Sequence, residues 1–363
     1  MRAHIESGAC AAVHIEPGAR AAVRTRSRSA GAVLLAALAV AALLSGCAKN
    51  SSNGDSPPPG APAHAAAAPV VRTPPTGTVL ASGPIAAALA EPATGRLVLL
   101  NPDGVTVRIL DPADLSAPAR TLTLPARTAA LVPGPSGQVL AAAGRAVLHI
   151  DVAAAVVHPT PVDGEVRAVT QRPDGTMAVV LSDGRVLVLA ADGHVLQTIT
   201  GMPGDAIVAP GAAIAVLNRD QTTLTQVDFR RMRPGLQLRA GIGASNVITD
   251  HYGRMLVTDT SGGALLVFTT DPLEMHQMFP VGASPYALAY DQATETVWVT
   301  LTASNEVVGY DLSTGIPEEV GRFVTVRQPN SVTVDSRSGD LFVGSATGDG
   351  LQRIGAEERK RGQ

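Results

Sequence analysis

The sequence is poor in cysteine, in aromatic residues and in positive charge. Its 363 residues include two cysteines, Cys10 and Cys47, a single tryptophan and only 3% aromatic residues. With so few cysteines, a disulfide network is excluded and the core must depend on packing. The 28 Lys and Arg are outnumbered by 31 Asp and Glu. Because no positive surplus is present to hold a phosphate backbone, we expect no nucleic-acid partner.

The motifs of common enzyme families are also missing. There is no G-x-S-x-G elbow, no Walker loop and no Cys/His cluster. His194 and His251 fall in DGH and DHYG turns, where we expect solvated loop residues. No two of the histidines that follow the leader have a spacing that predicts a shared metal: His64, His149, His158, His194, His251 and His276. The sequence therefore predicts no catalytic residue and no cofactor.

No apolar run is long enough to span a bilayer as a helix, but a shorter one lies near the N-terminus. Ala30 to Leu44 is apolar over 15 residues and follows several arginines, which suits a secretory signal better than the roughly 20 residues of a transmembrane helix. It ends in Leu44-Ser45-Gly46-Cys47, similar to a bacterial lipobox. We predict a lipoprotein signal peptide over 1–46 and lipidation of Cys47. The alternative is an ordinary secretory signal followed by a chance cysteine.

This leader predicts that the protein is exported and anchored by lipid to the outer leaflet of the plasma membrane. Residues 47–77 are rich in Ser, Pro, Ala and Gly, and such a composition cannot offset the entropy of folding. We predict a flexible, disordered tether there. The folded domain is expected over 78–356, followed by a polar tail over 357–363.

A repeat of about 41 residues organises the folded part. Residues 281–324 read as one complete unit of four strands, and turn residues recur 36 to 44 positions apart: Gly95, Gly137, Gly175, Gly211, Gly253, Glu295 and Gly339. A four-stranded meander cannot bury its faces alone, so such units must stack on one another. The first strand of each unit is rich in Ala, as expected where blades converge on an axis. The pattern predicts an all-β, seven-bladed β-propeller.

The last repeat lacks a fourth strand before the polar tail begins. Thr78 to Ser82 has a strand-like sequence and no partner in its own repeat. We therefore predict that it pairs with Leu351 to Ile354 and completes the seventh blade, which hides an edge that would otherwise promote aggregation.

One repeat carries a family resemblance. TVWVTLTASNEVVGYDLSTG, residues 296–315, resembles the YVTN-type propeller repeat. The run 302–317, with TVRQPNS at 325–331 and the lipobox, resembles the LppL-like conserved lipoproteins of mycobacteria. The resemblance is strongest from Arg239 to Ser331 and faint in the first two blades. It implies a membrane-anchored, seven-bladed propeller, and it supplies no catalytic residue.

The loops that precede the inner strands gather the polar residues that could form a binding surface. Projecting the repeat places these side chains around the axis: Arg127, Arg167, Asn246, Tyr286, Gln328 and Asn330. Because Arg and Tyr often anchor interfaces, we predict a non-catalytic binding or scaffold protein with an envelope protein or glycan as partner. The alternative is a metal-dependent propeller hydrolase, lactonase or lyase, whose oxygen ligands would be Glu165, Asp205, Asn246 and Asn330.

Overall fold

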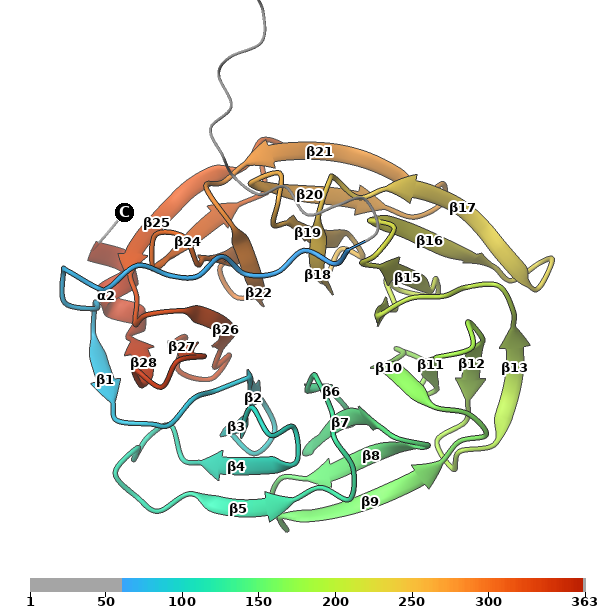
Figure 1. Ribbon diagram of the computed structural model, residues 1–363, viewed down its shortest axis with the longest axis horizontal. Coiled ribbons are helices and arrows are strands. Elements are labelled where there is room, and N and C mark those ends of the chain that lie inside the picture. Colours follow the sequence, from blue (N-terminus) through green and yellow to red (C-terminus); the bar gives the residue numbers. More distant parts are fainter. Residues whose placement is uncertain (1–60, 362–363) are drawn as a thin grey trace, which may run out of the picture. The chain divides into compact units, whose positions relative to one another are not determined.

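Seven four-stranded antiparallel sheets surround a common axis as the blades of a propeller (Figure 1). The computed structural model describes residues 61–361. In each blade the first strand lies nearest the axis and the fourth lies at the rim (Figure 1). The predicted seven-bladed propeller is confirmed. The signal peptide predicted over 1–46 and the lipidation site at Cys47 lie outside the described residues.

The strands follow the repeat from blade to blade. Blade 1 contains β2 (Ala87–Glu91), β3 (Arg96–Leu100), β4 (Thr106–Leu110) and β5 (Arg120–Thr123). Blade 2 contains β6 (Val132–Pro133), β7 (Gln138–Ala143), β8 (Ala146–Asp151) and β9 (Val156–Pro161). Blade 3 contains β10 (Val166–Gln171), β11 (Met177–Leu181), β12 (Val186–Leu189) and β13 (Val195–Ile199). Blade 4 contains β14 (Ala206–Val208), β15 (Ala215–Asn218), β16 (Thr223–Asp228) and β17 (Arg233–Arg239).

The remaining blades have the same order of strands, apart from the last. Blade 5 contains β18 (Ala244–Thr249), β19 (Met255–Asp259), β20 (Ala264–Thr269) and β21 (Glu274–Pro280). Blade 6 contains β22 (Pro285–Asp291), β23 (Thr296–Leu301), β24 (Glu306–Asp311) and β25 (Glu318–Val324). Blade 7 combines β26 (Pro329–Val334), β27 (Leu341–Ser345) and β28 (Leu351–Ile354) with β1 (Thr78–Leu80). A short helix, α2 (Ala356–Arg361), ends the described chain.

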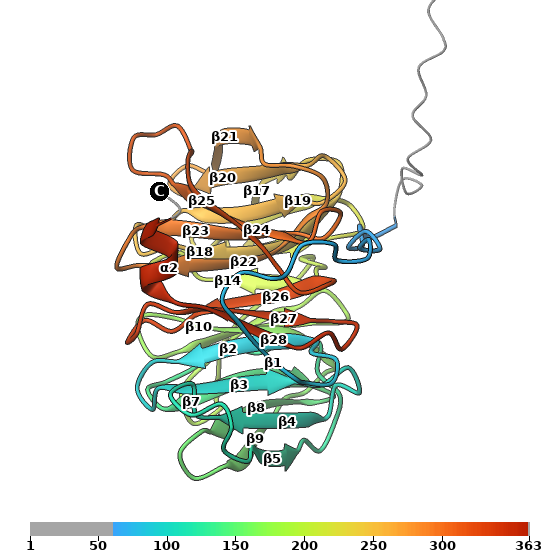
Figure 2. The same ribbon diagram turned by 90° about the vertical axis from the view of Figure 1, so that its left-hand side faces the viewer.

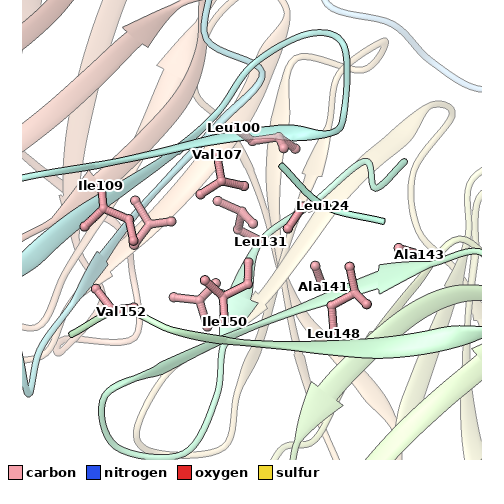
Figure 3. Packing of buried hydrophobic residues seen from close by; sticks show 12 residues of the cluster. Leu100, Val107, Ile109, Leu124, Leu131, Ala141, Ala143, Leu148, Ile150 and Val152 are labelled. Carbon is pink, nitrogen blue, oxygen red and sulfur yellow. The ribbon is translucent and has the colours of Figure 1, made fainter. Parts of the chain in front are cut away.

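The hydrophobic core lies between the blades. Successive side chains of a strand point to opposite faces of the sheet, and Leu97 to Leu100 of β3 are all fully buried. Leu97 and Leu99 pack toward blade 7, whereas Val98 and Leu100 pack toward blade 2. Figure 3 shows the layer between blades 1 and 2. Seven such clusters, one between each pair of neighbouring blades, close the ring.

The turns from which the repeat was recognised share one backbone conformation. The six aligned glycines all have positive φ, between 60° and 84°, and Glu295 has φ 54° at the seventh position. Glycine adopts this left-handed region without steric cost, which explains its recurrence there.

The ring closes through the N-terminal strand. β1 pairs antiparallel with β28, with Thr78 opposite Arg353 and Leu80 opposite Leu351. Gln352 is fully buried beside this joint, and its Nε2 donates to the carbonyls of Thr76 and Val324. The predicted closure is confirmed, although the strand ends at Leu80 and does not reach Ser82.

Two segments differ from their predicted character. Residues 61–77 fall within the predicted tether, yet they run along the propeller as an extended segment held by hydrogen bonds, because backbone amides and carbonyls can be satisfied without large apolar side chains. Residues 357–361 of the predicted tail lie in helix α2, which is docked by Arg359.

Candidate functional site on the upper face

The propeller has two unlike faces. We call upper the face made by the loops that lead into each first strand and that join second to third strands, and lower the opposite one. The N-terminal segment, residues 61–77, lies on the upper face, whereas α2 lies on the lower face (Figure 2). In Figure 1 the segment crosses in front of blades 5 and 6.

Side chains of the upper face hold this segment by its backbone. Gln328 Nε2 donates to the Ala66 carbonyl at 2.9 Å, and Gln328 Oε1 accepts the Ala68 N–H at 2.8 Å. Four further bonds join Ser284 Oγ to Ala66 N, Arg219 Nη2 to Ala63 O, Arg327 Nε to Ala68 O and Asn305 Nδ2 to Pro69 O, at 2.9 to 3.2 Å. We call these five residues, Arg219, Ser284, Asn305, Arg327 and Gln328, the clamp.

The clamp follows the symmetry of the ring. Ser284 and Gln328 each stand immediately before the first strand of their blade, and each precedes a proline. Gly243 has the same position in blade 5, and a Cβ added there would lie 2.9 Å from Ala63 Cβ. The segment therefore crosses the same loop position in three successive blades.

The clamp is fixed by the propeller itself. Asn305 Oδ1 accepts the backbone N–H of Gln328 at 3.0 Å, and Gln328 Nε2 also donates to Asn330 Oδ1 at 3.0 Å. Ser284, Asn305 and Gln328 all have φ between 54° and 56°. Non-glycine residues with this backbone conformation are uncommon.

The structure brings some of the predicted binding residues together. Asn246, on β18, donates through Nδ2 to the carbonyl of Tyr286, on β22, at 2.9 Å. Gln328 and Asn330 are joined in blade 7. Arg127, in the loop before β6, is exposed and donates to the Pro102 carbonyl at 3.5 Å. Arg167, on β10, is also exposed. Within residues 61–361, no hydrogen bond or ion pair joins either arginine to the other four predicted residues.

The four residues of the metal alternative are mostly engaged locally. Asp205 Oδ2 accepts the backbone N–H of Arg219 at 3.1 Å, and the amides of Asn246 and Asn330 bond as described above. Glu165 is exposed just before β10. In the part of the chain that the structure describes, no three His, Cys, Asp or Glu side chains gather where they could hold a metal ion.

A second polar group lies on the lower face, between blades 5 and 6. The Tyr290 hydroxyl lies 2.6 Å from His251 Nδ1, and the Tyr252 hydroxyl donates to Glu295 at 2.6 Å. Burial, with the charges of Asp250 and Glu295, raises the pKa of Tyr290 to about 12. The hydrogen bond to Glu295 raises the pKa of Tyr252. Both phenols are neutral at physiological pH, and Tyr252 donates its proton to the Glu295 carboxylate.

A hollow of about 480 Å³ opens on the lower face between blades 1 and 7. Its charged lining is largely paired: Arg96 with Asp111, and Arg353 with Asp340, both at 2.5 Å. Arg337 donates to the carbonyl of Thr94 at 3.4 Å. Because these charges neutralise one another, the hollow offers no strong field for a charged ligand.

Sequence reasoning missed several of these neighbours. In the lower-face group, His251 and Tyr290 are 39 residues apart, and Tyr252 and Glu295 are 43 apart. Each separation is about one repeat, so a comparison of equivalent positions in successive blades could have predicted these contacts. His149 and His158 are directly opposite on β8 and β9, a pairing that only strand register reveals. Burial, and secondarily the charge of His158, lowers the pKa of His149.

Comparison with known proteins supports the fold only. No protein-family model matches the chain, and no curated protein matches its sequence. Among solved structures, a chain of hydrazine synthase from Kuenenia stuttgartiensis is similar with a TM-score of 0.63 and 12% identity over 77% of this chain and 97% of that one. A streptogramin B lyase is similar with a TM-score of 0.59 and 11% identity over 77% and 96% of the two chains. Virginiamycin B lyase from Staphylococcus aureus has a TM-score of 0.59 and 14% identity over 76% and 97%.

These likenesses define the class of protein as a seven-bladed β-propeller. At such identities they carry no chemistry from those proteins to this one. Within residues 61–361, no helix is long and apolar enough to cross a membrane.

Proposed function

We propose that this protein is a lipid-anchored propeller of the cell envelope that acts by binding, through its upper face, and not by catalysis. The observation that carries the proposal is the clamp, because five side chains from blades 4, 6 and 7 converge on one extended chain. A surface that already holds a polypeptide has the donors and acceptors that a partner requires.

The anchor is the second part of the proposal. The lipobox-like sequence at Leu44 to Cys47 follows a short apolar run, which suits export and acylation. An anchored propeller would present its upper face to an envelope protein or glycan. Exposed Arg127 and Arg167 extend this face beyond the clamp, into blades 2 and 3.

Substitutions on the two faces test the proposal in the anchored protein. Arg167→Glu combined with Tyr286→Ala changes the upper face. The matched lower-face control combines Tyr252→Ala with Arg230→Glu, at an exposed residue in the turn between β16 and β17 on the lower face. We expect the first pair to lose its crosslinked envelope partner and the second to keep it, with both variants folded. A partner that persists in the upper-face variant contradicts the proposal.

The alternative is an enzyme, a hydrolase or lyase that uses a metal ion. Two of the similar structures are lyases by name, and their fold is shared. This alternative requires a divalent cation bound by Glu165, Asp205, Asn246 and Asn330. Titration with Ca²⁺ and Mg²⁺ distinguishes the two functions: saturable binding that Asp205→Asn and Glu165→Gln abolish favours the enzyme.

A further inference from the structure

The N-terminal segment meets the upper face in the manner of a bound peptide. All six hydrogen bonds from the clamp reach backbone atoms of residues 63–69. Gln328 is the centre of this contact because its amide binds the carbonyl of one residue and the N–H of the second residue after it. Such contacts recognise an extended backbone and leave most side chains free to vary.

Side-chain selection is confined to two positions. Ala63 and Ala68 are 1% and 4% exposed, whereas His64, Ala67 and Pro69 point outward and are exposed. Gly243 lies beside Ala63, and a Cβ added at Gly243 would be 2.9 Å from the Ala63 Cβ, so the two chains meet closely there. The site therefore favours small residues at two positions five apart, in a chain kept extended by proline.

The propeller does not need this segment to complete its sheets. The fourth strand of blade 7 is β1, and residues 61–72 belong to no sheet. Within the clamp, Gln328 is held by Asn305 and Asn330, and the Ser284 hydroxyl lies 2.7 Å from that of Thr302. Removing the segment would therefore leave a formed site whose donors and acceptors face water.

We propose that the clamp is a binding site for extended peptides rich in alanine and proline, and that the protein's own residues 61–69 are an internal occupant which a second chain displaces. The proposal rests on the upper-face function above and assigns its class of ligand. The short connection to β1 gives the internal segment a millimolar effective concentration. A second peptide must therefore bind more tightly than the internal segment, or be present in excess, to displace it.

The test uses the full-length protein in detergent and a fluorescein-labelled peptide with the sequence of residues 61–72, APAHAAAAPVVR. Ala63→Asp with Ala68→Asp places two carboxylates in buried positions of the internal segment and expels it. We expect this variant to bind the peptide at least about tenfold more tightly than wild type, because the internal competitor is gone. Equal affinity for the two proteins overturns the proposal.

Gln328→Ala in the same background identifies the site. Loss of two hydrogen bonds predicts affinity about tenfold weaker. The matched control is Gln237→Ala, on the outer strand of blade 4, which should change nothing. A peptide carrying Asp at the positions of Ala63 and Ala68 should not bind. Unchanged affinity in Gln328→Ala contradicts the assignment.

A measurement on wild type avoids the substitutions. Saturating peptide should accelerate hydrogen exchange of the Ala66 and Ala68 amides by displacing the internal segment, and unchanged exchange at saturation contradicts displacement. If the peptide fails to bind while Arg167→Glu with Tyr286→Ala still loses its envelope partner, the ligand class is wrong and the upper-face function stands. If the peptide binds but the Arg167→Glu with Tyr286→Ala variant keeps its envelope partner, the proposed function fails and the peptide site stands.

Discussion

Single residues determine how the propeller responds to alkaline pH. Tyr310 is 2% exposed, and burial raises its pKa to about 12. A folded-state pKa above the unfolded value of about 10 means that folding favours the neutral phenol. This contribution to stability is complete below pH 10 and is lost as the pH rises through 12.

Tyr310→Phe should remove this contribution to the alkaline loss of stability, while Tyr290, whose pKa is also about 12, keeps its own. At neutral pH the substitution should cost about 1 kcal/mol, because the hydroxyl donates to the Val281 carbonyl at 3.4 Å and also hydrogen-bonds the Arg322 side chain. Between pH 10 and 12, wild type should lose about 2 kcal/mol more than the variant. Urea unfolding at pH 7, 10 and 12 measures the difference, and parallel losses in both proteins contradict the account.

Elements at the two chain ends secure the ring. β1 supplies the fourth strand of blade 7, and its loss would leave β28 as an open edge. Deleting residues 78–80 should lower the melting temperature by several degrees and promote aggregation. Deleting residues 48–60 should leave the melting temperature unchanged. Calorimetry with light scattering checks both, and equal effects of the two deletions contradict the role of β1.

Helix α2 ties blade 6 to blade 7 on the lower face. Arg359 pairs with Asp291 at 3.1 Å, donates to the Gly339 carbonyl and stacks on Trp298 with its guanidinium carbon 5.2 Å from the ring centroid. Both charged side chains are at least nine-tenths buried. Arg359→Ala leaves Asp291 buried without its cation and should cost about 3 kcal/mol or more. Exposed Arg337→Ala on the same face should cost under about 0.5 kcal/mol. Chemical denaturation measures both, and equal costs contradict the docking role.

At the scale of the whole molecule, the sequence alone was sufficient to predict the ring of seven blades and its closure by the N-terminal strand. A repeat of about 41 residues is a local signal, and turns that require positive φ mark it at Gly95 and its equivalents. The missing strand was recognisable because blade 7 ended one strand short.

The candidate site was only partly predictable, because its contacts join positions that no local pattern links. Gln328 was placed on the upper face by projection, but its partners Ala66 and Ala68 are about 260 residues away. Their role depends on backbone atoms, and an alanine-rich stretch has the same composition whether it is docked or free. The Arg359 to Asp291 pair spans 68 residues and was missed for the same reason.

The lipid anchor remains a prediction at this scale. Cys47 should carry a diacylglycerol, since the Leu44 to Cys47 sequence ends a short apolar run. Intact-mass analysis of the membrane fraction should show an acylated N-terminus at Cys47, and Cys47→Ser should release or mislocalise the protein. A mature N-terminus that is unacylated and starts at a residue other than Cys47 would contradict the predicted lipid anchor.

Binding through the upper face is tested most directly by site-specific photocrosslinking in intact cells. Benzoylphenylalanine at position 167 places the probe on the upper face, and the same group at position 230 places it on the lower face. The account predicts a discrete adduct from position 167 that Tyr286→Ala removes, and none from position 230. An adduct from position 230 alone, or the same adduct from both positions, would contradict it.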